Sequence, residues 1–196
     1  MPKIISDDER ERTRKAIIKH TKQLIITKQE IKDVTVDDIV RSAGLGKGSF
    51  YSYFKSKEEC LYQVLETALT DVYQQVELIK KEKLSTKEKT IKFVREVYLA
   101  EYRVDYYFNT TDIEALFRKL PLEFSEREQN FIGSGLIDNI MRLMDISRVQ
   151  AETFYTILEC IEFTSANNTI SKQAKEEALN VLIQSIAEYV GKHSTV

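Results

Sequence analysis

The stretch from Thr35 to Phe54 reads TVDDIVRSAGLGKGSFYSYF. Its first half has apolar residues at i, i+3, i+4 and i+7, which predicts a short helix with one buried face: Val36, Ile39, Val40 and Ala43. Three of the six glycines of the chain follow, at positions 44, 46 and 48. We expect Gly44 to end the first helix in a left-handed conformation and Gly46 to cap a second one. The stretch therefore predicts a helix, a glycine-rich turn and a further helix.

The second short helix is expected to present a small, hydroxylated outer face. At about 100° per residue, Phe50 and Phe54 point into the core, while the outward positions are Gly48, Ser49, Ser52 and Tyr53. Small and hydroxylated side chains suit a helix that enters a DNA major groove, and flanking cations bind phosphates: Lys47, Lys55 and Lys57. Helical hairpins with packing aromatics share this spacing, so spacing alone leaves both interpretations open.

The stretch from Thr35 to about Leu65 resembles the signature of the tetracycline-repressor (TetR) family, T-v-x-x-I-A-x-x-A-G-v-s-k-g-t-l-Y-x-Y-F-x-s-K-e-e-L. The residues that match are Thr35, Ile39, Ala43, Gly44, Lys47, Gly48, Tyr51, Tyr53, Phe54, Lys57, Glu58, Glu59 and Leu61. The chain departs from the pattern at Glu30-Ile31, at Val40 and at Gly46, where the family usually has Ser or Thr. The glycine removes one hydroxyl that could contact DNA.

The resemblance implies an all-α fold with an N-terminal three-helix DNA-binding domain over residues 1–56, whose helix-turn-helix motif covers 35–54. Residues 57–196 would form an effector-binding and dimerisation domain. The implied function is a homodimeric transcription repressor that a small-molecule effector releases from operator DNA. The residues implied to lie nearest the bases are Lys47, Gly48, Ser49 and Ser52, and those implied to bind phosphates are Thr35, Tyr51, Tyr53 and Lys57.

The rest of the chain is also predicted to be helical, because it lacks the sustained apolar/polar alternation and the hairpin turns that are typical of strands. Capping pairs predict helix starts at Ser6/Glu9, Thr35/Asp38, Ser56/Glu59, Ser85/Glu88 and Ser125/Glu128. About nine helices are expected, over 8–29, 36–43, 47–54, 57–82, 86–109, 111–120, 126–144, 147–168 and 172–191. The helix over 57–82 carries an apolar stripe about seven turns long and is expected to join the two domains.

The composition is that of an ordinary globular protein, with 42% apolar and 31% charged residues in 196. Residues 1–60 hold 13 Lys and Arg against 10 Asp and Glu, a net of +3, whereas the remainder has a net of −5. The N-terminal third is thus the part that could face an anion. Without an apolar run of membrane length, a cytoplasmic protein with no membrane partner is expected.

The cysteines and histidines indicate no metal site and no cofactor. Cys60 and Cys160 lie far apart in apolar helical patterns, which favours two buried thiols. The only histidines are His20 and His193, and neither belongs to a zinc or hydrolase motif. We therefore do not expect an enzyme. A small all-helical enzyme and a protein-binding helical adaptor are the alternatives, and an adaptor would lack the steep salt dependence of DNA binding.

Residues 57–196 lead to two further expectations. An aromatic stripe predicts an effector pocket, with the candidates Phe93, Tyr98, Tyr102, Tyr106, Phe117, Phe131 and Met141. The last two helices resemble the four-helix dimer bundle of the family, with the candidates Phe154, Ile157, Leu158, Ile161, Leu179, Leu182, Ile183 and Ile186. For both sets the alternative is a monomer core with no ligand or partner, and the sequence leaves it open.

Overall fold

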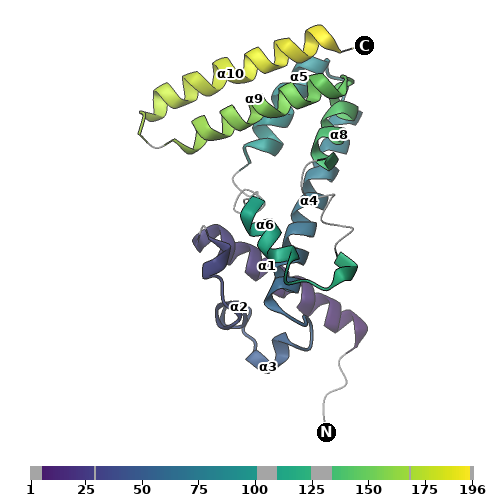
Figure 1. Ribbon diagram of the computed structural model, residues 1–196, viewed down its shortest axis with the longest axis vertical. Coiled ribbons are helices and arrows are strands. Elements are labelled where there is room, and N and C mark those ends of the chain that lie inside the picture. The colour runs from purple at the N-terminus through teal and green to yellow at the C-terminus, as the bar shows by residue number, and fades with distance from the viewer. Residues whose placement is uncertain (1–5, 29, 101–109, 125–133, 168, 195–196) are drawn as a thin grey trace. The chain divides into compact units, whose positions relative to one another are not determined.

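The computed structural model describes residues 6–28, 30–100, 110–124, 134–167 and 169–194, and each element within these ranges is helical (Figure 1). This confirms the all-α expectation. By its internal contacts the chain divides into unit 1, residues 1–70 with 102–128, and unit 2, residues 71–101 with 129–196. These compact units differ from the functional division expected at residue 56, which stays a prediction.

Unit 1 contains the helices of the predicted DNA-binding region. They are α1 (Asp7–Lys28), the 3₁₀ turn η1 (Ile31–Asp33), α2 (Val36–Ser42), α3 (Lys47–Phe50) and the first half of α4 (Lys57–Lys81), followed by α6 (Thr110–Phe117) and η4 (Leu122–Phe124). The apolar positions at 61, 64, 65 and 68 of α4 are buried, as the stripe predicts. Tyr62 is also fully buried, and its ring meets those of Phe117 at 5.9 Å and Phe124 at 4.9 Å.

Unit 2 consists of helices packed around one apolar core. It contains the second half of α4, then α5 (Thr86–Lys92), the π-helix η2 (Phe93–Tyr98), α8 (Ser134–Met144), α9 (Arg148–Ala166) and α10 (Lys172–His193). The two last helices run side by side (Figure 1). Val76 and Ile79 of α4 lie in this core with residues from α8, α9 and α10.

Side-chain caps begin most of these helices. Thr35/Asp38 and Ser85/Glu88 form complete capping boxes, as predicted. Ser56 accepts from the Glu59 amide, but the Glu59 carboxylate accepts from the Lys55 amide, one residue before the box position. Caps that the sequence reading missed start α9 at Ser147 and α10 at Ser171. The predicted Ser125/Glu128 pair lies outside the described residues.

Two predicted helices are too long. The segment expected over 47–54 is helical only to Phe50, because the amides of Ser52 and Tyr53 turn to i−3 acceptors. The segment expected over 86–109 ends at Tyr98, where the backbone of Leu99 leaves helical geometry after the π-helix. Phe93, Val94, Val97 and Tyr98 of this π-helix are all buried. Of the segment expected over 126–144, the described helix begins at Ser134.

The predicted dimer residues are mostly core residues of the chain itself. Six of the eight are at most 8% exposed in the unit 2 core: Phe154, Leu158, Ile161, Leu179, Ile183 and Ile186. Ile157 and Leu182 are partly buried against the same core. These side chains therefore lie in the core of the chain itself, and their contact with a second copy stays a prediction. The physical reason is that a helix buries its most apolar stripe first, and α5 and η2 already cover it.

The two cysteines differ in burial. Cys60 is fully buried beside Thr21, whereas Cys160 is exposed on α9, so the expectation of two buried thiols is wrong for Cys160. The described part of the chain shows no group of three or more His, Cys, Asp and Glu that could hold a metal ion. Within the same ranges, none of the helices has both the length and the apolar character that crossing a membrane requires.

Candidate DNA-binding surface

The turn between α2 and α3 has the geometry that its glycines predict. Gly44 has a φ of 67°, in the left-handed region, and the following Leu45 amide donates to the Val40 carbonyl at 2.8 Å. Gly46 is extended, with φ −82° and ψ 152°, and caps α3 through its backbone alone. The turn thereby closes α2 and starts α3 within four residues.

Two phenylalanines anchor α3 in unit 1. Phe50 and Phe54 are at most 1% exposed, and their ring centroids lie 5.6 Å apart. The guanidinium of Arg14, on α1, lies over the Phe54 ring at 5.0 Å. Because the buried side of α3 is fixed in this way, its opposite side is held open to solvent.

The outer side of α3 and the turn after it carry five of the predicted DNA-binding residues, all exposed: Lys47, Gly48, Ser49, Tyr51 and Ser52. A Cβ at Gly48 would meet nothing within 4 Å, so the helix surface is open there. Lys47 pairs with Asp37 at 2.9 Å, and this hydrogen bond raises the pKa of the lysine. The structure brings these residues together on one surface, whereas Tyr53 is half-buried beside them.

Thr35 and Asp38 form a network that fixes the start of α2. The Thr35 hydroxyl donates to Asp38 Oδ2 at 2.6 Å, and the same oxygen accepts from Lys28 Nζ at 2.8 Å. The bond from Lys28, with those from Thr35, holds the pKa of Asp38 well below its usual range. The Thr35 hydroxyl is thus already used in an intramolecular hydrogen bond.

Lys57 is placed differently from a phosphate-binding lysine on an open surface. It is half-buried, and its Nζ donates to the Val34 carbonyl at 3.0 Å, which ties the start of α4 to the segment before α2. A phosphate contact by Lys57 would require its side chain to move away from Val34.

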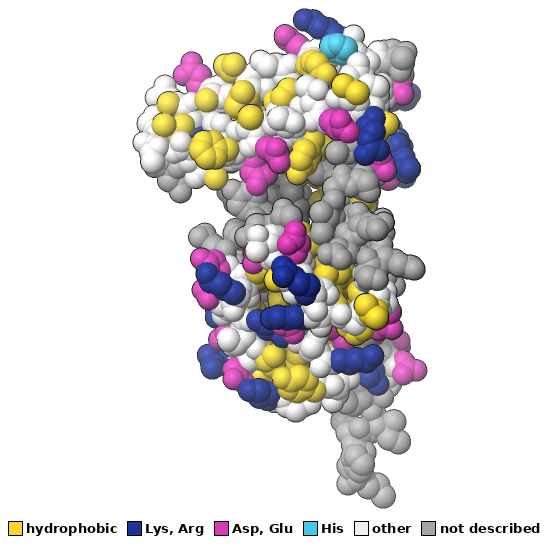
Figure 2. Space-filling model, in the orientation of Figure 1, with side chains coloured by type: hydrophobic (Ala, Val, Ile, Leu, Met, Phe, Trp, Pro, Cys, Tyr) yellow, Lys and Arg dark blue, Asp and Glu magenta, His cyan; other side chains and the backbone are white. Residues whose placement is uncertain are grey.

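Arg10 is a cation at this surface that the sequence reading missed. Its Nη2 donates to the Ser52 carbonyl at 3.0 Å, so α1 places an exposed guanidinium beside the end of α3. The sequence contains a signal for this cation, because Arg10 lies four residues before Arg14 and therefore on the same face of α1. At the α3 end of unit 1, Figure 2 shows Lys and Arg side chains around a patch of apolar or tyrosine side chains.

The predicted effector residues fall into three groups. Phe93 and Tyr98 are buried in unit 2, where Met141 packs against the core. The Tyr98 hydroxyl donates to Glu162 Oε2 at 2.7 Å. Phe117 belongs to unit 1 and packs on Tyr62. Tyr102, Tyr106 and Phe131 lie outside the described residues.

Comparison with known proteins finds one family at the DNA-binding region. Residues 17–64 match the family described as bacterial regulatory proteins, tetR family. No curated protein matches the chain. Three solved structures share the fold over most of both chains. A TetR/AcrR family member is 19% identical, with a TM-score of 0.67 and coverage of 92% of this chain and 99% of that chain.

The other two are Escherichia coli NemR in its reduced form and RolR in complex with resorcinol. NemR is 15% identical with a TM-score of 0.63, covering 93% of this chain and 98% of its own. RolR is 16% identical with a TM-score of 0.50, covering 97% and 92%. These likenesses extend the fold of such regulators over both units, while the sequence match falls on α1 to α4. The helix-turn-helix region of this chain, residues 17–64, is thus similar to the tetR family of bacterial regulatory proteins.

Proposed function

We propose that this DNA-binding regulator is a homodimeric repressor that a small-molecule effector releases from its operator. The observation that carries the proposal is the outer side of α3, where exposed small and hydroxylated residues are held open by the buried Phe50 and Phe54. A helix of this kind fits a major groove, since nothing bulky separates its backbone from the base edges. Residues 1–56 would carry the DNA contacts and residues 57–196 the other two functions.

The contacts can be assigned from exposure. Gly48, Ser49 and Ser52 would lie nearest the bases, with Lys47 beside them. Tyr51, which is 53% exposed, and Arg10 would bind phosphates at either side of α3. Thr35 would contribute mainly by holding the first turn of α2, whose amides would then face the backbone of DNA. Lys57 and Tyr53 are secondary contacts, because both are half-buried.

A second copy of the chain would pack on the exposed side of α9. Five exposed, uncharged residues of α9 are spaced alternately four and three positions apart, which is the spacing of the contact line between paired helices. We call these residues the α9 stripe: Val149, Thr153, Thr156, Cys160 and Phe163. Val149 is 72% and Phe163 76% exposed, although both are apolar, and Val181 on α10 is 61% exposed. Such side chains on one face favour an interface between copies. Figure 2 shows hydrophobic side chains along the α9 and α10 face of unit 2.

An effector site is proposed in unit 2 around Tyr98. The Tyr98–Glu162 hydrogen bond places a hydroxyl and a carboxylate beside the aromatic core residues Phe93 and Phe154. Tyr98 also ends a π-helix, an element that recurs at functional sites. An aromatic effector with a hydrogen-bonding group suits these residues. RolR was solved with resorcinol, a compound of this kind, which makes small phenols the first probes to try.

The proposal can be tested by fluorescence anisotropy of the purified protein on its own upstream intergenic DNA. A scrambled duplex is the comparison, at about 0.15 M salt, where non-specific binding is weak. We expect tight binding to the natural duplex only, and a steep loss of affinity as salt rises. The double variant Arg10→Ala/Tyr51→Ala should lose operator binding, whereas Lys83→Ala, an exposed cation in unit 2, should not.

Equal and weak binding to both duplexes would contradict an operator in that region, and a selection from random DNA would then locate one or show none. No selected sequence at all would overturn the proposal in favour of the adaptor alternative. Small phenols that lower anisotropy on the operator, but leave a Tyr98→Phe/Glu162→Gln variant bound, would support the effector site.

A further inference from the structure

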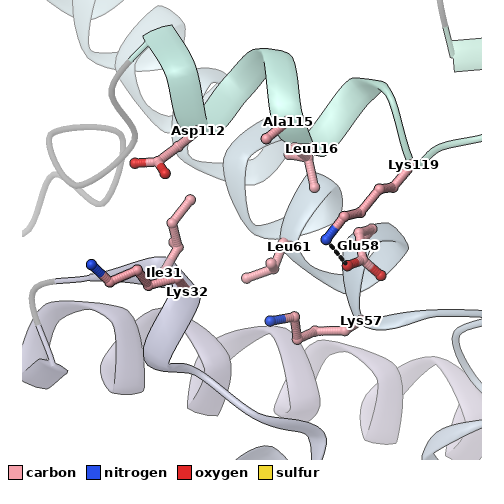
Figure 3. A pocket seen from close by; sticks show the side chains of 9 residues that line it. All are labelled: Ile31, Lys32, Lys57, Glu58, Leu61, Asp112, Ala115, Leu116 and Lys119. Carbon is pink, nitrogen blue, oxygen red and sulfur yellow. Dashed lines mark hydrogen bonds and ion pairs between the residues drawn. The ribbon is translucent and has the colours of Figure 1, made fainter.

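A pocket opens on unit 1 between α6, η1 and the start of α4 (Figure 3). Its volume is about 110 Å³, and it lies outside the exposed side of α3 and outside unit 2. We propose that this pocket binds a small monocarboxylate, whose hydrocarbon part lies on Ile31, Leu61 and Leu116 and whose carboxylate is held by Lys57. The proposal is independent of the effector site in unit 2.

The inner wall of the pocket is apolar. Leu61 and Leu116 are 4% exposed and Ile31 is 7% exposed, so they form a nearly buried floor, and Ala115 adds a small side chain at the edge. In Figure 3 these residues come from three different elements and converge on one space. A dry cavity of about 150 Å³ holds a benzene ring. A volume of 110 Å³ therefore suits a smaller body, such as a chain of a few carbons.

Two of the three lysines that line the pocket form ion pairs with a carboxylate. Glu58 is matched by Lys119 at 3.4 Å, and Figure 3 shows this pair at one end. Lys32, at the other end, pairs with Glu30 at 2.6 Å, and this hydrogen bond raises the pKa of the lysine. Lys32 and Lys119 thus each have a carboxylate partner.

Lys57 is the remaining cation, and its surroundings favour an anion. The ammonium is half-buried, and within the described ranges its one hydrogen bond goes to the uncharged Val34 carbonyl, with no carboxylate within ion-pair distance. A half-buried charge that has lost water is stabilised by a counterion. A carboxylate supplies that counterion while its hydrocarbon tail covers the apolar floor. A cationic or neutral ligand of the same length would cover the apolar floor but would supply no counterion for Lys57.

The test uses the full-length chain with isotope-labelled Ile and Leu methyl groups, followed by NMR as butyrate is added. Butylamine and 1-butanol, which have the same carbon chain, are titrated in parallel. We expect saturable shifts at Ile31, Leu61 and Leu116 with butyrate, with a dissociation constant on the order of a millimolar. Affinity for 1-butanol should be about tenfold lower, because the charged hydrogen bond is missing, and butylamine should not bind.

Two matched variants of α6 locate the site. Ala115→Phe fills the pocket and should abolish the butyrate shifts, whereas Thr111→Phe, an exposed position of α6 outside the lining, should retain them. Lys57→Gln should reduce butyrate binding to the level of 1-butanol. The methyl spectra report folding in the same samples, and the α6 pair decides the matter if Lys57→Gln does not fold. Absence of saturable shifts, equal affinity for all three probes, or persistence in Ala115→Phe would each overturn the proposal.

Discussion

The two thiols of this chain show how strongly surroundings control one type of side chain. Burial raises the pKa of Cys60 to about 11, and its sulfur sits beside the Thr21 hydroxyl. Cys160 is exposed on α9. Since the thiolate is the reactive form, iodoacetamide at neutral pH should modify Cys160 and leave Cys60 intact in the folded monomer, at protein concentrations below those at which two copies pair. Mass spectrometry of peptides after a short reaction measures both. Modification of Cys60 at a similar rate would contradict its burial.

Asp38 makes a pH-dependent contribution to stability. Its pKa is lowered in the folded chain, first by the hydrogen bond from Lys28 and then by those from Thr35. A lowered folded pKa means that the contribution is fully present above the unfolded pKa of about 3.9 and disappears as pH falls through the folded value. Asp38→Asn should therefore be less stable than the parent at pH 7, and the difference should shrink progressively as pH falls below about 4. Urea unfolding at several pH values checks this, with Asp33→Asn, an exposed acid nearby, as the control.

At the scale of a single element, Gly48 is a residue of low helix propensity on the proposed DNA-contact surface of α3, so a substitution there affects stability and binding separately. A methyl group at position 48 meets nothing in the protein, and the backbone there is not left-handed. Gly48→Ala should raise the free energy of unfolding by about 0.5–1 kcal/mol. If α3 enters the groove as proposed, the same methyl should weaken operator binding. Thermal unfolding and anisotropy measure the two effects, and a gain in stability with unchanged affinity would place Gly48 away from DNA.

The cap of α2 is another element-scale feature. The Thr35 hydroxyl accepts from the Asp38 amide, and the Thr35 amide donates to the Asp38 carboxylate in return. Thr35→Ala should cost about 1 kcal/mol of stability, whereas Thr35→Ser should keep most of it. If Thr35 acts mainly by holding α2, operator affinity should follow the same order. Chemical denaturation and anisotropy on the three proteins test this, and a Thr35→Ser variant as defective as Thr35→Ala would point to a role of the methyl group.

At the scale of the whole molecule, the α9 stripe should form the contact between two copies. Thr156→Lys places a charge in the stripe, while Glu159→Lys places one on the neighbouring exposed side of the same helix. We expect Thr156→Lys to weaken dimerisation at least tenfold, because a lysine buried without a partner is costly, and Glu159→Lys to have little effect. Sedimentation over a range of concentrations compares them. Equal dimerisation in all three proteins would remove α9 from the interface.

Cys160 offers an independent test of the same interface. It lies near the middle of α9, so two copies of α9 that cross about a twofold axis there would bring their Cys160 thiols together. Mild oxidation should then give a covalent dimer that Cys160→Ser abolishes and Cys60→Ser does not. A dimer by sedimentation that never cross-links would mean that the copies meet at another part of the chain.

The all-α class, the turn glycines and the helix-turn-helix could all be predicted from the sequence. These depend on local physics, since apolar spacing, left-handed glycine and capping pairs act within a few residues. Gly44, Gly46, Phe50 and Phe54 accordingly behave as predicted. The start of α2 at Thr35 could be predicted for the same reason.

Which apolar or charged groups face solvent depends on how the helices pack against one another. Phe154 and Ile183 look like interface residues in sequence, yet the chain buries them against its own α5 and η2, and the weaker stripe of α9 is left exposed. Arg10 reaches α3 and Lys57 turns to Val34 across separations of 42 and 23 residues. Burial and pairing over such distances depend on how all the helices pack together, and helix periodicity does not encode that.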